Sequence, residues 1–156
     1  MPLRPDIDEV ADGLWVGPCP KTPEFIQSLA SDFGVRSLLS VQTDEDLTST
    51  GMSWPLLWEF LMRSGIGANR VAITDFDDDA LRHGLEAAVA VIQSARVAGN
   101  VAYVHCTAGV NRSPSVAIAW LVVHGGLDLD AAWDQVTSRR SCAPNRRALE
   151  SWLASR

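Results

Sequence analysis

The chain has 156 residues, of which 19 are acidic and 13 basic, giving a formal net charge of −6. This length corresponds to one domain, and an apolar content of 47% with six tryptophans is sufficient to fill its core. We therefore expect residues 1–156 to fold as a single domain. The excess of acids argues against nucleic acid and against an anionic membrane surface as partners, because basic side chains mediate binding to both.

The cysteines and the N-terminus give no sign of export. Cys19, Cys106 and Cys142 are too few, and odd in number, for a disulfide framework. The N-terminus becomes acidic before any apolar segment begins, unlike a signal peptide. The longest apolar run, Val116–Val123, is much shorter than the roughly 20 residues that span a bilayer. We expect a soluble, monomeric, cytoplasmic protein.

The first half of the chain alternates strand patterns with helix patterns. Thr22-Pro23-Glu24 has the cap residue, the proline and the acid that typically begin a helix. In chain order, we expect a strand at Leu14–Val16, a helix from Thr22 to near Gly34, a buried strand at Val35–Val41, a polar loop at Asp44–Ser53, a helix at Trp54–Met62, a strand at Val71–Thr74 and an acidic loop at Asp75–Asp79.

The second half is dominated by helices. Ala80–Val97 has the clearest helix pattern, because its apolar residues recur on one face. We then expect a strand at Val101–His105 and helices at Arg112–His124, Leu129–Arg139 and Asn145–Ala154. Strands that alternate with helices predict an α/β fold with a largely parallel central sheet and helices on both faces.

One strand-to-helix junction carries a chemical motif, His105-Cys106-Thr107-Ala108-Gly109-Val110-Asn111-Arg112-Ser113. The N-terminus of a helix has unpaired N–H groups and a partial positive charge, so a loop curled around it forms a site for a tetrahedral anion. Gly109 permits backbone angles that a side chain would forbid, and the Arg112 guanidinium can bridge two phosphate oxygens. We expect phosphate to be bound by Thr107, Ala108, Gly109, Val110, Asn111 and Arg112.

The same loop is expected to activate a nucleophile. A thiol at a helix N-terminus beside an arginine ionises readily, so Cys106 is expected to attack the bound phosphorus as a thiolate. Ser113 is expected to stabilise that thiolate by hydrogen bonding, and His105 to order the loop. Each residue also has a purely structural alternative. Cys106 could be a buried core cysteine, Ser113 a polar residue in the first helical turn, and His105 a core histidine. The joint spacing of His, Cys, Gly and Arg favours the catalytic interpretation.

A phosphoester also needs a proton for its departing oxygen, which a carboxylic acid on a nearby loop would supply. The stretch Asp75-Phe76-Asp77-Asp78-Asp79 follows an expected strand. It emerges at the same sheet edge as the cysteine loop if the two strands are parallel neighbours. Asp78 or Asp79 suits capping of the following helix. Asp75 is therefore the first candidate for the acid, and Asp77 is the second.

These residues resemble the active-site loop of cysteine-dependent dual specificity phosphatases, a branch of the protein tyrosine phosphatases. The sequence is similar in particular to plant starch-excess-type glucan phosphatases and to laforin, through residues 106–109, Asp75-Phe76-Asp77, Val16-Gly17-Pro18-Cys19, Thr22-Pro23-Glu24 and Arg140-Ser141-Cys142-Ala143-Pro144. The resemblance covers roughly residues 13–152. It implies a dual-specificity-phosphatase-like catalytic domain that needs no cofactor or metal, with Cys106 as nucleophile, Arg112 as phosphate clamp and Asp75 as general acid. It also implies that Phe76 packs against sugar rings.

The sequence departs from the glucan phosphatases at the positions where they carry aromatic residues that stack on sugar. Ser49 and Thr50 replace an aromatic pair, and Ala143 replaces another aromatic. We therefore expect a phosphatase acting on phosphoprotein, at phosphotyrosine and phosphoserine or phosphothreonine. A phosphoglucan is the alternative substrate, and a non-catalytic phosphate-binding module is a further alternative.

Overall fold

The computed structural model of the protein describes residues 5–156. Its centre is a five-stranded sheet in the order β1-β2-β5-β3-β4. The strands are β1 (Asp8–Ala11), β2 (Leu14–Gly17), β3 (Val35–Ser40), β4 (Gly67–Arg70) and β5 (Val101–His105). β1 is antiparallel to β2, whereas the pairings of β2 with β5, β5 with β3 and β3 with β4 are parallel.

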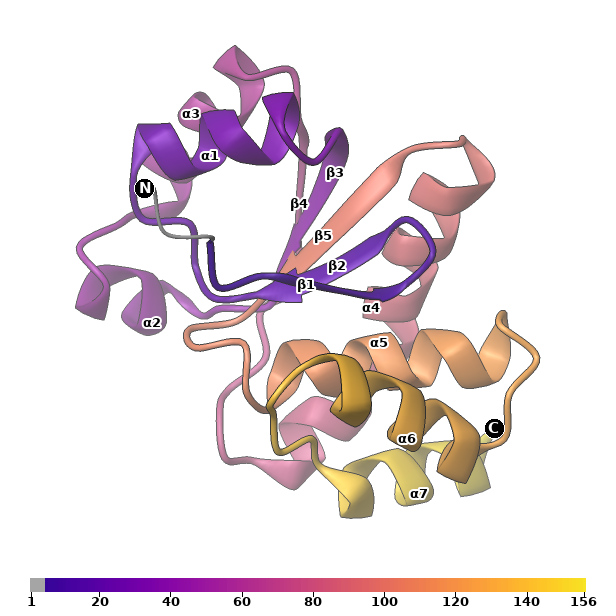
Figure 1. The fold of residues 1–156 in the computed structure, drawn as a ribbon. Helices are drawn as coiled ribbons and strands as arrows, with labels where there is room; N and C mark the ends of the chain where they lie inside the picture. Colours follow the sequence, from indigo (N-terminus) through magenta and orange to yellow (C-terminus); the bar gives the residue numbers. More distant parts are fainter. Residues whose placement is uncertain (1–4) are drawn as a thin grey trace.

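Helices lie on both sides of the sheet (Figure 1). One side carries α1 (Pro23–Ser31), α2 (Asp44–Ser49) and α3 (Trp54–Arg63), and the other carries α4 (Asp78–Val97), α5 (Arg112–Val123), α6 (Leu129–Arg139) and α7 (Arg146–Ser155). The core is divided accordingly. On β5, Tyr103 packs on the side of α1 to α3, and its neighbours Ala102 and Val104 pack on the side of α4 to α7. The predicted α/β fold with a largely parallel sheet is confirmed.

Most predicted elements are present, and two have the predicted bounds, β5 and α6. The first helix begins where the sequence indicated, because the Thr22 side chain accepts a hydrogen bond from the backbone N–H of Phe25 and Pro23 is the first helical residue. None of the helices within residues 5–156 combines the length and the apolar character needed to cross a membrane.

Two predictions in the first half of the chain are wrong. Residues 44–49 form α2 instead of a loop, because Thr43 and Asp46 make a reciprocal capping box and Leu47 is buried beneath the helix. The strand predicted at Val71–Thr74 lies four residues earlier, at Gly67–Arg70. Residues 71–73 continue as extended chain whose N–H groups still bond to the end of β3, from Val71 to Ser40 and from Ile73 to Val41.

One strand and one helix cap also differ from the sequence-based prediction. β1 is a half-exposed edge strand joined to β2 through Asp12-Gly13, with Gly13 at φ +75°, which is a known hairpin signal. The N-cap of α4 is Asp77, not Asp78 or Asp79 as predicted. The Asp77 side chain accepts a hydrogen bond from Ala80 N at 2.9 Å, because the chain turns at Phe76 and the helix begins directly after it.

The parallel strands end together at one edge of the sheet. Gly17 of β2 and Ser40 of β3 are both paired with His105 of β5, and Arg70 of β4 is paired with Ser40. β4 and β5 are parallel but are separated by β3. The cysteine loop and the acidic loop therefore leave the sheet at the same edge, which is where ligands bind in open α/β sheets.

Candidate active site

The loop between β5 and α5 is tied to its surroundings through its carbonyl groups. Each carbonyl from residue 106 to residue 111 accepts a hydrogen bond. The donors are His105 Nδ1 to Cys106, Cys19 N to Thr107, Arg140 Nη2 to Ala108, Arg140 Nε to Gly109, Ala143 N to Val110, and Ser115 N to Asn111. A trans peptide directs its C=O and the next N–H to opposite sides. The N–H groups of residues 107–112 therefore point away from these donors, into the loop.

This arrangement leaves the backbone N–H groups of the loop without partners in the described chain, as the anion site expected from the sequence requires. Within residues 5–156, no backbone N–H of residues 107–111 donates a hydrogen bond. Gly109 has φ +68°, a conformation that favours glycine, and a Cβ there would lie 2.5 Å from the carbonyl carbon of Gly17. The loop thus combines unpartnered donors with a helix N-terminus, which together favour a phosphate-sized anion.

Cys106 lies at the base of this loop and is buried, with 3% of its surface exposed. Its Sγ lies 3.2 Å from Ser113 Oγ in the first turn of α5. The structure therefore brings together the predicted nucleophile and the hydroxyl expected to stabilise it. Cys106, Cys19 and Cys142 are all free thiols.

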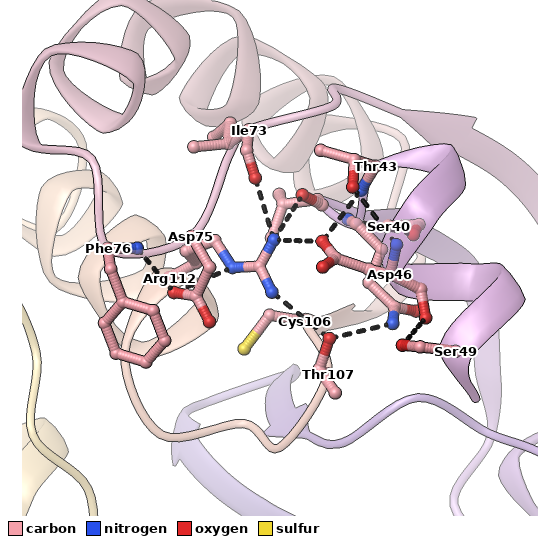
Figure 2. Close-up of polar contacts among 12 residues, drawn as sticks. Ser40, Thr43, Asp46, Ser49, Ile73, Asp75, Phe76, Cys106, Thr107 and Arg112 are labelled. Atoms are coloured by element: carbon pink, nitrogen blue, oxygen red, sulfur yellow. Dashed lines mark hydrogen bonds and ion pairs between the residues drawn. The ribbon is translucent and has the colours of Figure 1, made fainter.

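The Arg112 side chain is also buried and extends across the loop from the start of α5 (Figure 2). Its Nη1 donates to the carbonyl of Ile73 at 2.8 Å, and its Nη2 donates to Thr107 Oγ1 at 3.2 Å. Its Nε lies 3.3 Å from Asp75 Oδ1 but makes no hydrogen bond within the described residues. A buried guanidinium N–H without an acceptor is suited to a phosphate oxygen.

Asp46 holds this arginine, although no pattern in the sequence predicted a role for it. Asp46 Oδ2 lies 2.6 Å from Arg112 Nη1, on the side of the guanidinium opposite Asp75 (Figure 2). Burial raises the pKa of Asp46, but hydrogen bonds from Arg112 and Thr43 and the charge of Arg112 outweigh burial and leave the pKa below its usual value. The capping box that begins with Thr43 was the local signal that would have placed Asp46 on a helix.

The acidic loop brings Asp75 to the rim of the site. Asp75 Oδ1 accepts hydrogen bonds from Asn111 Nδ2 at 3.2 Å and from Phe76 N at 3.1 Å. Phe76 has φ +55° and is 90% exposed, and its ring points away from the Arg112 guanidinium (Figure 2). Asp77 instead caps α4. Of the two acid candidates, Asp75 contacts the loop and Asp77 is engaged in the helix.

Two hollows adjoin Asp75. One of about 690 Å³ is lined by the acidic loop, by Arg82 of α4, and by Arg147, Ala148 and Ser151 of α7. The other, of about 490 Å³, is lined by residues 43–46, Arg70, Ala72, Thr74 and Asp75. Charged side chains of both signs dominate the two linings. Within residues 5–156, no three His, Cys, Asp or Glu side chains form a group that could hold a metal ion.

His105 lies behind the loop and is fully buried. Burial lowers its pKa to about 4, so the ring is neutral at neutral pH. A carbonyl oxygen only accepts hydrogen bonds, so the contact of 3.1 Å with the Cys106 carbonyl requires the proton on Nδ1. His105 therefore ties the start of the loop to β5.

Comparisons with known proteins agree with this geometry. The profile described as "Dual specificity phosphatase, catalytic domain" matches residues 20–155. The chain is 36% identical to the phosphoglucan phosphatase DSP4 of Castanea sativa over 97% of its own length, and 25% identical to laforin of Mus musculus over 72%. It spans 39% and 37% of the lengths of these two relatives.

A solved structure shows the same fold. The human DUSP28 structure superposes with a TM-score of 0.73, at 28% identity, over 99% of this chain and 94% of that chain. These matches confirm the resemblance expected from the loop, the acidic segment and the flanking motifs. Since the family profile matches nearly all of the sequence, the chain belongs to the dual specificity phosphatase family of cysteine-dependent phosphatases.

Proposed function

We propose that the protein hydrolyses phosphomonoesters through a phosphocysteine intermediate. One observation carries the proposal. The Cys106 thiol lies in a loop whose N–H groups are unpartnered, next to the Arg112 side chain, whose Nε–H makes no hydrogen bond in the described chain (Figure 2). This arrangement places a nucleophile within an anion site, so a bound phosphoryl group faces the sulfur.

The first step forms the S–P bond and breaks the ester P–O bond. The Cys106 thiolate attacks phosphorus, the loop N–H groups and Arg112 bind the non-bridging oxygens, and Asp75 donates its proton to the departing alkoxide or phenoxide. The product alcohol then leaves. The hydrogen bond from Asn111 supports the assignment of Asp75 as the acid, because it holds the carboxyl group beside the loop.

The second step breaks the S–P bond. Asp75, now a carboxylate, removes a proton from a water molecule that attacks phosphorus, and inorganic phosphate forms as the thiolate departs. The Ser113 hydroxyl donates to that thiolate, which is consistent with its Oγ lying 3.2 Å from Cys106 Sγ. Each role rests on the family's chemistry and on these distances.

For the substrate, we propose a phosphorylated protein side chain. The hollows on either side of Asp75 are lined by aspartates and arginines, which suit the charged residues that flank a phosphorylated side chain in a polypeptide. The chain also has small or polar residues at Ser49, Thr50 and Ala143, where the resemblance to the glucan phosphatases implies aromatic residues.

A phosphoglucan is the second candidate, and two observations favour it. The relatives at 36% and 25% identity include a phosphoglucan phosphatase and laforin. Phe76 presents an exposed ring next to Asp75, and a flat aromatic face is suited to the apolar face of a sugar.

Two assays test the proposal. Turnover of 4-nitrophenyl phosphate tests the chemistry: the wild-type protein should release nitrophenol, and Cys106→Ser should abolish turnover while retaining phosphate binding. A wild-type protein that binds phosphate without turnover would instead be a binding module. Phosphate release from phosphotyrosine and phosphoserine peptides and from phosphorylated amylopectin then separates the substrates. Release from amylopectin but from no peptide would overturn the phosphoprotein assignment.

A further inference from the structure

A second buried arginine contacts the cysteine loop from its outer side. Arg140 follows directly after α6 and is 4% exposed. Its Nε donates to the carbonyl of Gly109 at 2.7 Å, and its Nη2 donates to the carbonyl of Ala108 at 3.3 Å. These two residues are the middle of the loop, where the chain is farthest from both β5 and α5.

The position of these two carbonyls decides where the next two N–H groups point. Across a planar trans peptide, the C=O of Ala108 and the N–H of Gly109 point in opposite directions, as do the C=O of Gly109 and the N–H of Val110. Arg140 therefore holds both N–H groups toward the inside of the loop. The other loop carbonyls accept hydrogen bonds from the His105 ring, from backbone N–H groups and from the Ser115 hydroxyl, so Arg140 is the only charged side chain among these donors in the described residues.

Arg140 is held in turn by two acids that precede or belong to β1. Its Nη1 lies 3.1 Å from Asp6 Oδ1 and 3.0 Å from Asp8 Oδ2. The two acids are on the protein surface, with side-chain exposures of 71% and 30%. The planar Arg140 guanidinium donates to the two carboxylates and to the two loop carbonyls at the same time. A lysine ammonium group cannot reproduce this set of contacts.

We propose that Arg140 is a positioning residue for phosphate binding, acting through the Ala108 and Gly109 carbonyls and held in place by Asp6 and Asp8. This inference rests on the proposed phosphatase function. It assigns a role in the site to β1 and the residues just before it, because Asp8 and Asp6 supply the carboxylates that orient the arginine. A Cβ at Gly109 would lie 2.6 Å from Arg140 Nη2, which shows how closely the two are packed.

The test compares Arg140→Met, Arg140→Lys and a matched control, Arg139→Met. Arg139 is the adjacent residue, and it is exposed. In Arg140→Met, kcat/KM for 4-nitrophenyl phosphate should fall about 10- to 100-fold, and the inhibition constant of orthovanadate should rise by a similar factor, since loop N–H groups bind the same oxygens in both cases. Arg140→Lys should recover part of both losses. Arg139→Met should behave as the wild type.

All measurements are made at a temperature at which circular dichroism shows every variant to be folded. If Arg140→Met does not fold, Arg140→Lys and Asp8→Asn serve instead, with an expected loss of vanadate affinity of about 2- to 10-fold. Vanadate affinity and kcat/KM within twofold of the wild type in the folded variants would overturn the positioning role. Absence of turnover in the wild type would instead overturn the proposed function, so the two failures are distinguishable.

Discussion

Asp46 Oδ2 lies 2.6 Å from Arg112 Nη1, although the two residues are 66 positions apart in the sequence. The carboxylate is about a quarter exposed, whereas the guanidinium is almost fully buried. The contact fixes one end of the guanidinium and leaves Nε directed toward Asp75. In the proposed mechanism Arg112 therefore meets phosphate already oriented, at a low cost in side-chain entropy.

Replacing Asp46 by asparagine should reduce both stability and activity. Asp46→Asn removes the negative charge that offsets the buried Arg112 cation. We therefore expect the free energy of unfolding to fall by about 2 kcal/mol. This loss is smaller than that for a fully buried ion pair, because Asp46 is partly exposed. kcat/KM should fall about tenfold as the guanidinium loses its fixed orientation. Urea denaturation and turnover of 4-nitrophenyl phosphate measure the two effects. Asp44→Asn, at an exposed acid on the same helix, is the control, and equal effects of the two variants would contradict the prediction.

The assignment of Asp75 as the acid predicts a dependence on the leaving group. Asp75→Asn should lower kcat by about 10²- to 10³-fold for an alkyl phosphate and much less for 4-nitrophenyl phosphate, because a good leaving group needs no proton. Asp77→Asn is the matched control, since asparagine caps a helix as well as aspartate does. The measurement is kcat across a series of aryl and alkyl phosphates. A larger loss in Asp77→Asn would show that the acid is Asp77.

The buried histidine predicts a decline in stability at acidic pH. The pKa of His105 is lowered to about 4 in the folded protein from 6.5, so between these values the unfolded chain binds more protons. The stability that the neutral His105 ring contributes is therefore fully present above pH 6.5 and is lost as the pH falls toward 4. Between pH 7.5 and pH 5.5 we expect it to remove about 1 kcal/mol of stability.

This decline is measured by urea denaturation of the wild type and of His105→Gln at the two pH values. Glutamine does not titrate and carries an amide that can donate to a carbonyl. The variant should therefore show a smaller loss of stability between pH 7.5 and pH 5.5 than the wild type. Identical losses in both proteins would assign the effect to other groups.

Replacing Gly109 by alanine should reduce stability by more than the strain of its left-handed backbone conformation alone. Gly109→Ala places a Cβ 2.5 Å from the Gly17 carbonyl carbon at φ +68°, whereas Gly51 has a similar φ of +76° with no atom within 4 Å of a Cβ. Gly51→Ala should cost about 1 kcal/mol, the cost of the left-handed conformation. Gly109→Ala should cost at least twice as much and lower kcat/KM about 100-fold, because the loop must shift. Thermal denaturation and kinetics of both variants check the difference, and equal stabilities would show that the loop adjusts freely.

The residues that we propose to react could be selected from the sequence because they are close together in it. Cys106, Gly109, Arg112 and Ser113 lie within one strand-to-helix junction, and the chemistry of a helix N-terminus depends on local backbone geometry alone. Asp75 was selected because it follows an apolar extended segment, although the strand itself ends earlier, at Arg70. The alternation of strands and helices was enough to predict a parallel sheet. Local capping signals likewise placed the start of α1.

The residues that hold the site together were decided only by the tertiary structure. Asp46 and Arg140 approach the loop from α2 and from the end of α6, and Asp6 and Asp8 reach Arg140 from the N-terminal strand, more than 130 residues away in the sequence, with separations of 134 and 132. No periodicity or spacing encodes such contacts, because they depend on which sheet edge and which helix ends meet in space. The sequence by itself determined the candidate reacting groups, and packing determined how those groups are oriented.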